Sequence, residues 1–476
     1  MKLKTQLAIL LLAPNLLFAQ DWQPLFDGKS LEGWKASDPA GSFHVADGQI
    51  VCDGPRSHLF YVGPEGRADF KNFELSAEVM THNGANSGLY FHTVFQPQGF
   101  PEQGFEVQVL NRRPVAGSYR ENKLTGSLYA VRNVYKPLVP DDQWFTLRVR
   151  VVGKRVQVRV NDQWVVDYVE PDPAPDIPGH PGRKLGHGTF ALQCHDPASK
   201  TFFRNLQVRR LPDTVTDAAS PAPAFGDYER EVVRLGAANY PVVNYHVHLK
   251  GGLSLEDALA SSRQTGIFYG IAINCGLNFS VTNDAGIDAY LASMRGQPCF
   301  VAMQAEGREW VHLFSPAAIS RFDYVFTDAM TIFDDQGRRM RLWIPAEVPP
   351  IKDPQAFMDM LADRTVQILE HEPINVYVNP TFLPAQIAAD YDQLWTESRM
   401  QKVVAAAAAH HIAIEINSRY RLPSLAFIRL AKAAGCQFTF GTNNGDREIG
   451  RLDYAFQMIR DAGLKPQDIW VPRSKL

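Results

Sequence analysis

The sequence predicts a multidomain protein in which an all-β antiparallel sandwich is followed by an α/β TIM-like (β/α) barrel. Three observations support this prediction. Residues 21–212 contain short runs in which hydrophobic and polar residues alternate, whereas residues 236–476 alternate short apolar runs with helix-like segments. A stretch rich in proline and alanine separates the two patterns. The chain has 476 residues, 45% of them hydrophobic, which is enough for two sizeable cores.

The first twenty residues have the pattern of a secretory signal peptide. Two lysines follow Met1, residues 7–18 form a short apolar run, and Ala19 is a small residue suited to cleavage. The run is too short to cross a bilayer, and the sequence predicts no transmembrane segment elsewhere. We therefore expect a periplasmic or secreted protein whose mature chain begins near Gln20 or Asp21.

Charge and cysteine content exclude several classes of protein. The formal net charge of −3 gives no electrostatic reason to expect nucleic acid or an anionic membrane as a partner. Five scattered cysteines do not form the framework of a disulfide-built scaffold. An oxidising compartment permits one bridge, for which Cys52 and Cys194 are candidates, and the sequence leaves this open.

The predicted sandwich consists of short strands separated by turn residues, with no helical pattern of useful length among them. Aromatic and β-branched residues recur with period two in each strand, and Asn161-Asp162 marks a tight hairpin turn. The clearest strands are 73–79, 88–94, 105–110, 145–151 and 156–160. This pattern is typical of an antiparallel β-sandwich.

After the predicted linker, 213–235, strands and helices alternate. Helices are expected at 255–265, 354–371 and 401–410. The apolar runs between them predict buried strands at 240–245, 268–273, 299–303, 324–326, 374–378, 412–416 and 438–440. Parallel βα units of this number and length suit one complete or slightly irregular barrel.

Polar residues on the sandwich strands are the first candidates for a site. Glu106 and Gln108 share one face of their strand, and Gln193 and His195 share a face of another. Such a face can bind a sugar by hydrogen bonds and stacking, and it offers a carboxylate and an imidazole for proton transfer. The other candidates are Asn86, Tyr90, His92, Asn111, Tyr129 and Arg204. A merely solvated sheet face would explain the same spacing.

Residues 25–211 resemble the 3-keto-disaccharide hydrolase domain family, a concanavalin-like jelly-roll sandwich. The matching motifs, in order, are Leu25-Phe-Asp-Gly-Lys-Ser-Leu-Glu-Gly-Trp, Gly84-Ala-Asn-Ser-Gly-Leu-Tyr-Phe, Gly104-Phe-Glu-Val-Gln-Val-Leu, Thr125-Gly-Ser-Leu-Tyr, Leu192-Gln-Cys-His and Phe203-Arg-Asn-Leu. The resemblance implies cleavage of glycosides whose glucose ring is oxidised at C3. Relatives that serve as accessory domains leave a sugar-binding role open. The family often has Asp at the position of Asn111, so an acid or metal role there is in doubt.

The chemistry of such a substrate assigns roles to these residues. A ketone at C3 acidifies the hydrogen at C2, so a base can form an enolate and the C1 substituent can leave by elimination, after which water adds. We expect Glu106 as the base and His195 as the acid or its partner, with Arg204 or a metal ion at the enolate. The expected sugar-binding residues are Asn86, Tyr90, His92, Gln108, Asn111, Tyr129 and Gln193.

In the predicted barrel, His246-Val-His248 ends the first strand. Residues two apart on a strand point to the same face, so both imidazoles would lie where barrel enzymes build their sites. A shared metal ion explains two neutral nitrogen donors at that point. Two polar residues at a strand end are the alternative explanation.

Residues 240–472 resemble the polymerase-and-histidinol-phosphatase (PHP) superfamily of metal-dependent hydrolases, on His246-Val-His248, Ala305-Glu306-Gly and Phe440-Gly-Thr-Asn-Asn. The resemblance implies a site of two or three metals. Amides stand at family ligand positions, namely Asn274, Asn379 and Asn443, and Asn is a poor zinc ligand. We therefore expect at most one divalent metal, zinc or manganese, held by His246, His248 and Glu306, with Asp328 as a further candidate. A barrel that serves only as scaffold or binding domain is the alternative.

Two functions follow from these patterns. In the first, the sandwich is a hydrolase or lyase that acts on a small carbohydrate, a 3-keto-disaccharide or 3-keto-glucoside, and the barrel is accessory. In the second, the barrel is a metal-dependent hydrolase and the sandwich is a carbohydrate-binding module. The amides at the ligand positions of the barrel favour the first function.

Overall fold

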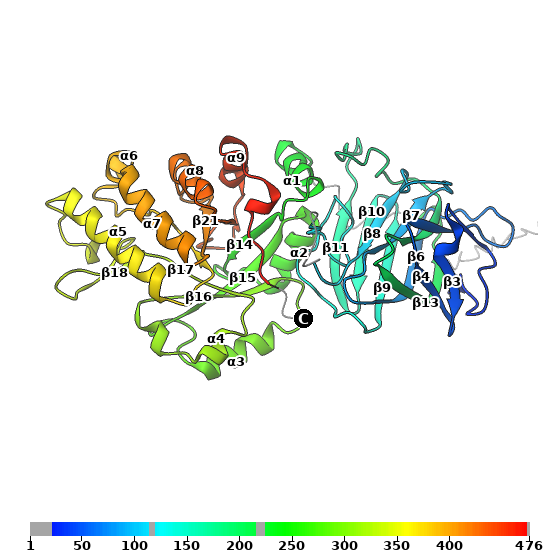
Figure 1. Ribbon diagram of the computed structural model, residues 1–476, viewed down its shortest axis with the longest axis horizontal. Helices are drawn as coiled ribbons and strands as arrows, with labels where there is room; N and C mark the ends of the chain where they lie inside the picture. The colour runs from blue at the N-terminus through cyan, green and yellow to red at the C-terminus, as the bar shows by residue number, and fades with distance from the viewer. Residues whose placement is uncertain (1–20, 114–119, 216–223, 474–476) are drawn as a thin grey trace, which may run out of the picture.

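The computed structural model describes residues 21–113, 120–215 and 224–473. The predicted signal peptide and part of the predicted linker lie outside these ranges. Figure 1 shows a β-sandwich at one end of the molecule and a barrel with its helices at the other. Within the described ranges, no helix combines the length and the apolar character needed to cross a membrane.

Two antiparallel sheets form the sandwich, as predicted. The larger sheet has eight strands and contains β1 (Gln23–Pro24), β3 (Phe43–Ala46), β4 (Gln49–Asp53), β6 (Phe73–Thr81), β9 (Phe145–Val152), β10 (Arg155–Val160), β11 (Gln163–Val169) and β13 (Lys200–Arg210). Its order is β11-β10-β9-β6-β13-β4-β3, and β1 pairs with β13. The smaller sheet has the order β2-β5-β12-β7-β8, with β2 (Trp34–Ala36), β5 (Ser57–Tyr61), β12 (Thr189–Cys194), β7 (Ser87–Thr93) and β8 (Phe105–Val109).

The five clearest predicted strands are confirmed as β6 to β10, and their alternation explains the core. In β6, Phe73, Leu75, Ala77 and Val79 point into the sandwich and are buried. Strands β7, β8 and β12 differ because every one of their residues is buried. Their polar residues therefore lie on a covered sheet face, where burial of a polar group requires a hydrogen-bonding partner.

The second half is a closed barrel of seven parallel strands, in the order β14-β15-β16-β17-β20-β21-β22. These are β14 (Val243–Val247), β15 (Phe268–Cys275), β16 (Phe300–Ala305), β17 (Tyr324–Thr327), β20 (Val376–Tyr377), β21 (Ala413–Asn417) and β22 (Phe438–Gly441). Each of the seven predicted apolar runs contributes one strand. The parallel barrel is thus as expected, but the described strands number seven rather than the eight of a TIM barrel.

Helices surround the barrel, and β18 (Thr331–Phe333) and β19 (Arg339–Arg341) form a hairpin after β17. The longer helices are α1 (Asp227–Ala237), α2 (Leu255–Thr265), α3 (Asp284–Ser293), α5 (Pro354–His371), α7 (Glu397–Ala409), α8 (Leu425–Ala433) and α9 (Asp453–Asp461). Side-chain caps start several of them: Ser254 accepts from the Asp257 amide and Ser424 from the Phe427 amide. Gly266 ends α2 at φ 81°, a conformation that glycine adopts readily.

The predicted linker is partly helical, and the two halves pack against each other. Helix α1 begins at Asp227 and so covers the last part of the segment 213–235, where Val232, Val233 and Leu235 form a buried apolar stripe. Helix α2 lies beside β11 where the halves meet (Figure 1). Across this boundary, Lys136 Nζ donates to the carbonyl of Cys299 at 2.8 Å, and Arg132 Nε donates to the carbonyl of Gln264 at 2.8 Å.

All five cysteines are free thiols and all are buried. Cys52 on β4 and Cys194 directly at the end of β12 do not form the bridge that the sequence left open. No disulfide therefore contributes to the fold of the described residues.

Candidate functional site

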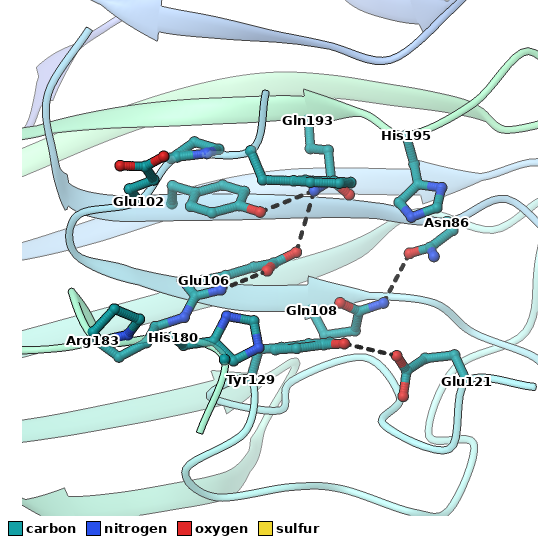
Figure 2. Close-up of a pocket in the computed structure, with 15 residues that line it drawn as sticks. Asn86, Glu102, Glu106, Gln108, Glu121, Tyr129, His180, Arg183, Gln193 and His195 are labelled. Atoms are coloured by element: carbon teal, nitrogen blue, oxygen red, sulfur yellow. Dashed lines mark hydrogen bonds and ion pairs between the residues drawn. The ribbon is translucent and has the colours of Figure 1, made fainter. Parts of the chain in front are cut away.

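The candidate site is a pocket of about 590 Å³ on the covered face of the smaller sandwich sheet (Figure 2). Strands β7, β8 and β12 supply its floor, and three loops supply its walls. The lining residues are Asn86, Tyr90, Phe100, Pro101, Glu102, Glu106, Gln108, Glu121, Tyr129, Gly179, His180, Pro181, Arg183, Gln193 and His195. Seven of the ten residues that the sequence predicted for the sandwich site therefore meet here: Asn86, Tyr90, Glu106, Gln108, Tyr129, Gln193 and His195.

Glu106 lies in the floor of this pocket with both carboxylate oxygens engaged. Arg183 Nη2 donates to Oε2 at 2.9 Å, and Gln193 Nε2 lies 3.4 Å from Oε1. The ion pair with Arg183 is almost fully buried. A Cβ atom at Gly88, on the neighbouring strand, would lie 2.6 Å from Oε1, so glycine at this position leaves the space that the carboxylate occupies.

The surroundings of Glu106 make it a stronger base than an exposed glutamate. Burial raises its pKa, because the low-dielectric interior disfavours the charged form, and the positive charge of Arg183 opposes this effect. The net shift is upward. Such a carboxyl is suited to accept a proton from a weakly acidic carbon.

Gln193 offers an unpaired acceptor to the pocket. Its Nε2 donates to the Tyr90 hydroxyl at 2.9 Å. Its Oε1 is buried and has no hydrogen-bond partner among the residues that the structure describes. A buried polar atom without a partner is costly, and at a pocket wall it indicates a position that a ligand hydroxyl can satisfy.

His195 follows β12 directly and forms a pair with the neighbouring Asp196. Its Nδ1 lies 2.7 Å from Oδ2 of Asp196. Burial by itself would raise the pKa of Asp196, but hydrogen bonds from His195, Ala198 and Ser199 lower it, so the carboxylate is ionised. An ionised partner at Nδ1 fixes the ring orientation and leaves Nε2 as the nitrogen that exchanges a proton.

The opposite wall is a network around Glu121 and Tyr129. The Tyr129 hydroxyl donates to Oε2 of Glu121 at 2.9 Å, and Lys123 Nζ lies 2.8 Å from Oε1 of the same carboxylate. The side chains of this ion pair are only 1% and 4% exposed. Nearby, Gln108 Nε2 donates to Oδ1 of Asn86 at 2.8 Å. The wall therefore presents amide, hydroxyl and carboxylate groups in fixed positions.

Four charged or titratable residues of the pocket were missed from the sequence: Glu102, Glu121, His180 and Arg183. They belong to loops, where no periodicity indicates which way a side chain points. Burial and the nearby positive charges of Arg183 and Lys123 lower the pKa of His180 to about 4. A usable signal was the segment 179–183, in which His180 lies between glycine and proline and Arg183 follows a second glycine.

Arg204, His92 and Asn111 do not line the pocket, which corrects their predicted roles. Arg204 lies on β13 in the other sheet, where Nε donates to Oε2 of Glu78 at 2.7 Å and the guanidinium covers the Trp144 ring. His92 is buried with Nε2 2.9 Å from the carbonyl of Lys71. Asn111 bonds Thr81, Pro140 and Thr125. The side chains of all three residues bond other parts of the sandwich, away from the pocket.

The residues predicted for the barrel site lie at the C-terminal ends of its strands, near a second pocket of about 400 Å³. Glu306 and Asp328 line this pocket, whereas His246 and His248 lie behind it, buried. His246 has Nδ1 2.7 Å from Oε1 of Glu415 and Nε2 3.2 Å from Oε1 of Gln304. His248 has Nδ1 3.1 Å from the carbonyl of Ala272.

These side chains are not grouped as the predicted metal site in the described residues, although Nε2 of His248 is buried without a hydrogen-bond partner. Among the described residues, no three His, Cys, Asp or Glu side chains are grouped so that they could hold a metal ion. Both nitrogens of His246 contact protein groups. Burial raises the pKa of both carboxyls, and the charge of Asp328 adds to the effect at Glu306. The pocket groups nearest to them are amides, which are weak ligands for zinc.

Comparison with solved structures gives several matches of low identity. A provisionally named glycosyl hydrolase from Parabacteroides distasonis ATCC 8503 is 22% identical, over 40% of this chain and 94% of its own, with a TM-score of 0.35. The carbohydrate binding module CBM66 from Bacillus subtilis is 15% identical, over 37% and 95%, with a TM-score of 0.26. The histidinol phosphate phosphatase of Lactococcus lactis subsp. lactis is 14% identical, over 47% and 95%, with a TM-score of 0.33.

No curated protein matches the chain. A family model does match its first half. Residues 21–209, which contain the whole pocket around Glu106, match the model of the 3-keto-alpha-glucoside-1,2-lyase-like domain, so the sandwich is similar to that family.

Proposed function

We propose that this protein cleaves 3-keto-glycosides in the sandwich pocket, by elimination followed by hydration. The observation that carries the proposal is the buried Glu106 carboxylate, paired with Arg183 and facing a pocket that also holds the His195–Asp196 pair. The family match over residues 21–209 supports this substrate class. The pocket size lies within the range of small-molecule sites.

The proposed reaction begins at C2 of the oxidised ring. Glu106 takes the C2 hydrogen as a proton, and the electron pair left behind forms the enolate of the C3 ketone. The enolate then expels the C1 substituent: the C1–O bond breaks, and the leaving oxygen takes a proton from His195. Water adds to the resulting C1–C2 double bond, with its oxygen at C1 and a proton at C2.

In this proposal, Arg183 takes the role that sequence analysis assigned to Arg204. Its guanidinium contacts Glu106, which supports a position beside the carbon that loses the proton. A fixed positive charge in a buried site stabilises an enolate oxygen strongly. Gln193, with its unpaired Oε1, and the Asn86–Gln108 pair are placed to hold ring hydroxyls.

The Glu106→Gln variant tests the proposal. The amide keeps the shape of the side chain but cannot accept the proton, so turnover of a 3-keto-disaccharide should fall by about 10²–10⁴-fold while binding survives. Glu78→Gln is the matched control, because Glu78 is a paired carboxylate on the other sheet. Disaccharides without the ketone should not be cleaved. Turnover at the wild-type rate by Glu106→Gln would refute the role of Glu106, and binding without turnover by the wild type would make the sandwich a binding module.

A further inference from the structure

We propose that the mouth of the barrel is a second carbohydrate site, which binds a neutral hexopyranose without a metal ion. The pocket of about 400 Å³ at the C-terminal ends of the strands combines fixed amides, two carboxylates, two cations and three aromatic rings. The proposal does not depend on the reaction in the sandwich.

Every strand of the barrel contributes to this pocket. Lys250, Asn274 and Glu306 follow or end β14, β15 and β16, and Asp328 follows β17. The remaining contributions are Asn379 after β20, Arg419 after β21 and Asn443 after β22. Side chains from all strand ends meeting at one opening is how barrels of this kind build ligand sites.

The polar groups are ordered by bonds among themselves. Asn274 Nδ2 donates to Oε1 of Glu306 at 2.6 Å, and Asn379 Nδ2 donates to Oδ2 of Asp328 at 3.2 Å. Asn443 Nδ2 donates to Oδ1 of Asn379 at 3.1 Å. Each carboxyl group keeps hydrogen-bonding capacity beyond these bonds, as an acceptor when ionised and as a donor and acceptor when protonated. Acceptors and donors held in place in this way can bond the hydroxyls of a pyranose.

Two of these amides lie on a backbone that must be held in place. Asn379 has φ 46° and Asn443 has φ 44°, in the left-handed region that only a few residue types tolerate. Asparagine is one of the few residue types that adopt this region readily. Here both conformations bring the side-chain amides together at one side of the pocket.

The ionisable groups of the pocket do not favour a cation, and its aromatic residues favour a sugar. Lys250 and Arg419 line the pocket beside two carboxyls, and burial raises the pKa of Glu306 to about 8 and raises that of Asp328, so the carboxyls give the pocket no surplus of negative charge. Phe279, Trp343 and Tyr420 line the same opening, and Trp343 stays 39% exposed. Aromatic rings can stack on the apolar faces of a pyranose, and amides and carboxyl groups can bond the hydroxyls around its rim.

The poor fit of the barrel residues to a metal ion also supports a sugar as the ligand. Both nitrogens of His246 contact protein groups, and the amides of Asn274, Asn379 and Asn443 line the pocket beside Glu306 and Asp328. Amides are strong hydrogen-bonding partners for hydroxyls and weak partners for divalent ions. Ligand binding here therefore relies on hydrogen bonds and stacking.

The test uses the full chain carrying Glu106→Gln and treated with EDTA, titrated with D-glucose, D-galactose and D-mannose by calorimetry. We expect saturable binding of at least one sugar. Trp343→Ala should weaken it by about fivefold or more through loss of stacking, and Trp343→Phe should restore most of it. Trp164→Ala is the matched control, because Trp164 is also 39% exposed but lies on β11 of the sandwich.

Three outcomes would overturn the proposal. The first is no saturable binding of any of the three sugars. The second is binding that Gln193→Ala abolishes and Trp343→Ala leaves intact, because that site would be the sandwich pocket. The third is binding that EDTA removes and zinc restores in the parent chain but not after His246→Ala, because the barrel would then use a metal.

Discussion

Glu106 and Arg183 form the ion pair on which the proposed proton transfer depends. Burial raises the pKa of Glu106. The positive charge of Arg183 lowers it by a smaller amount, so the net shift is upward. The reactive form is the carboxylate, so activity should rise with pH as Glu106 loses its proton. Since the pKa lies above that of an ordinary glutamate, the acid limb of the pH profile should lie at higher pH than for an exposed carboxylate.

Arg183→Gln should therefore change both the rate and its pH dependence. Without the positive charge, the pKa of Glu106 rises further and the acid limb of kcat/KM moves to higher pH. The loss of enolate stabilisation should lower kcat by about 10²-fold. Arg204→Gln is the control, because Arg204 pairs with Glu78 on the other sheet and its profile should match the wild type. An acid limb that stays in place in Arg183→Gln would show that Glu106 does not govern it.

Sequence periodicity predicted one part of this site and could not predict another. Glu106, Gln193 and His195 lie on or beside strands, where period two assigns each residue to a face. The same rule misplaced Arg204, because alternation along a strand does not say which of two sheets the strand joins. Arg183 was missed because it reaches Glu106 from a loop, and only the folded chain brings the two together.

Asn239, which lies between α1 and β14 in the barrel half, anchors a wall of the sandwich pocket. Its Oδ1 accepts from the backbone N–H of Asn122 at 3.0 Å and from Lys123 Nζ at 3.1 Å. Its Nδ2 donates to the backbone carbonyl of Arg120 at 2.6 Å. Asn122 Nδ2 returns a bond to the Asn239 carbonyl at 3.0 Å. This loop carries Glu121, so the barrel holds in place a carboxylate that the sandwich pocket uses.

Asn239→Gly should weaken sugar binding in the sandwich. Asn239 has φ 65°, which glycine tolerates, so the variant removes the side-chain bonds without straining the backbone. Loss of about 1 kcal/mol of loop anchoring should raise KM by about threefold to tenfold and change kcat little. Asn161→Gly, at φ 50° in the β10–β11 turn, is the matched control and should keep the wild-type KM. An equal loss in both variants would point to general destabilisation.

In the barrel, the number and kind of strands followed from the sequence more closely than their boundaries. Strand β20 has only two residues, Val376 and Tyr377, yet its apolar run marked it. Helix α1 was assigned to the linker because it follows a segment rich in proline and alanine. Its apolar stripe, Val232, Val233 and Leu235, is short, and the packing against the barrel that makes it a helix is not visible in the local pattern.

Residues 1–20 should be absent from the exported protein. The charged start and the apolar run of residues 1–20 favour a signal peptide that is removed on export. Sequencing the N-terminus of protein from a native periplasmic or secreted fraction should give a start near Gln20 or Asp21. An intact Met1 in that fraction would contradict this expectation.

The two halves should also fold separately, because each has its own sheets and many buried apolar residues, even though these residues form one continuous cluster across the boundary. Separation has a cost, since the buried Arg132 and the half-buried Lys136 lose the barrel carbonyls that they bond. We therefore expect chains cut at residue 217 to give two pieces that each melt cooperatively, the sandwich piece at a lower temperature than the full chain. Adding the barrel piece should restore both the melting temperature and the KM of the sandwich, because Asn239 again holds the loop of Glu121. If neither piece shows a cooperative transition by circular dichroism, the halves form one folding unit.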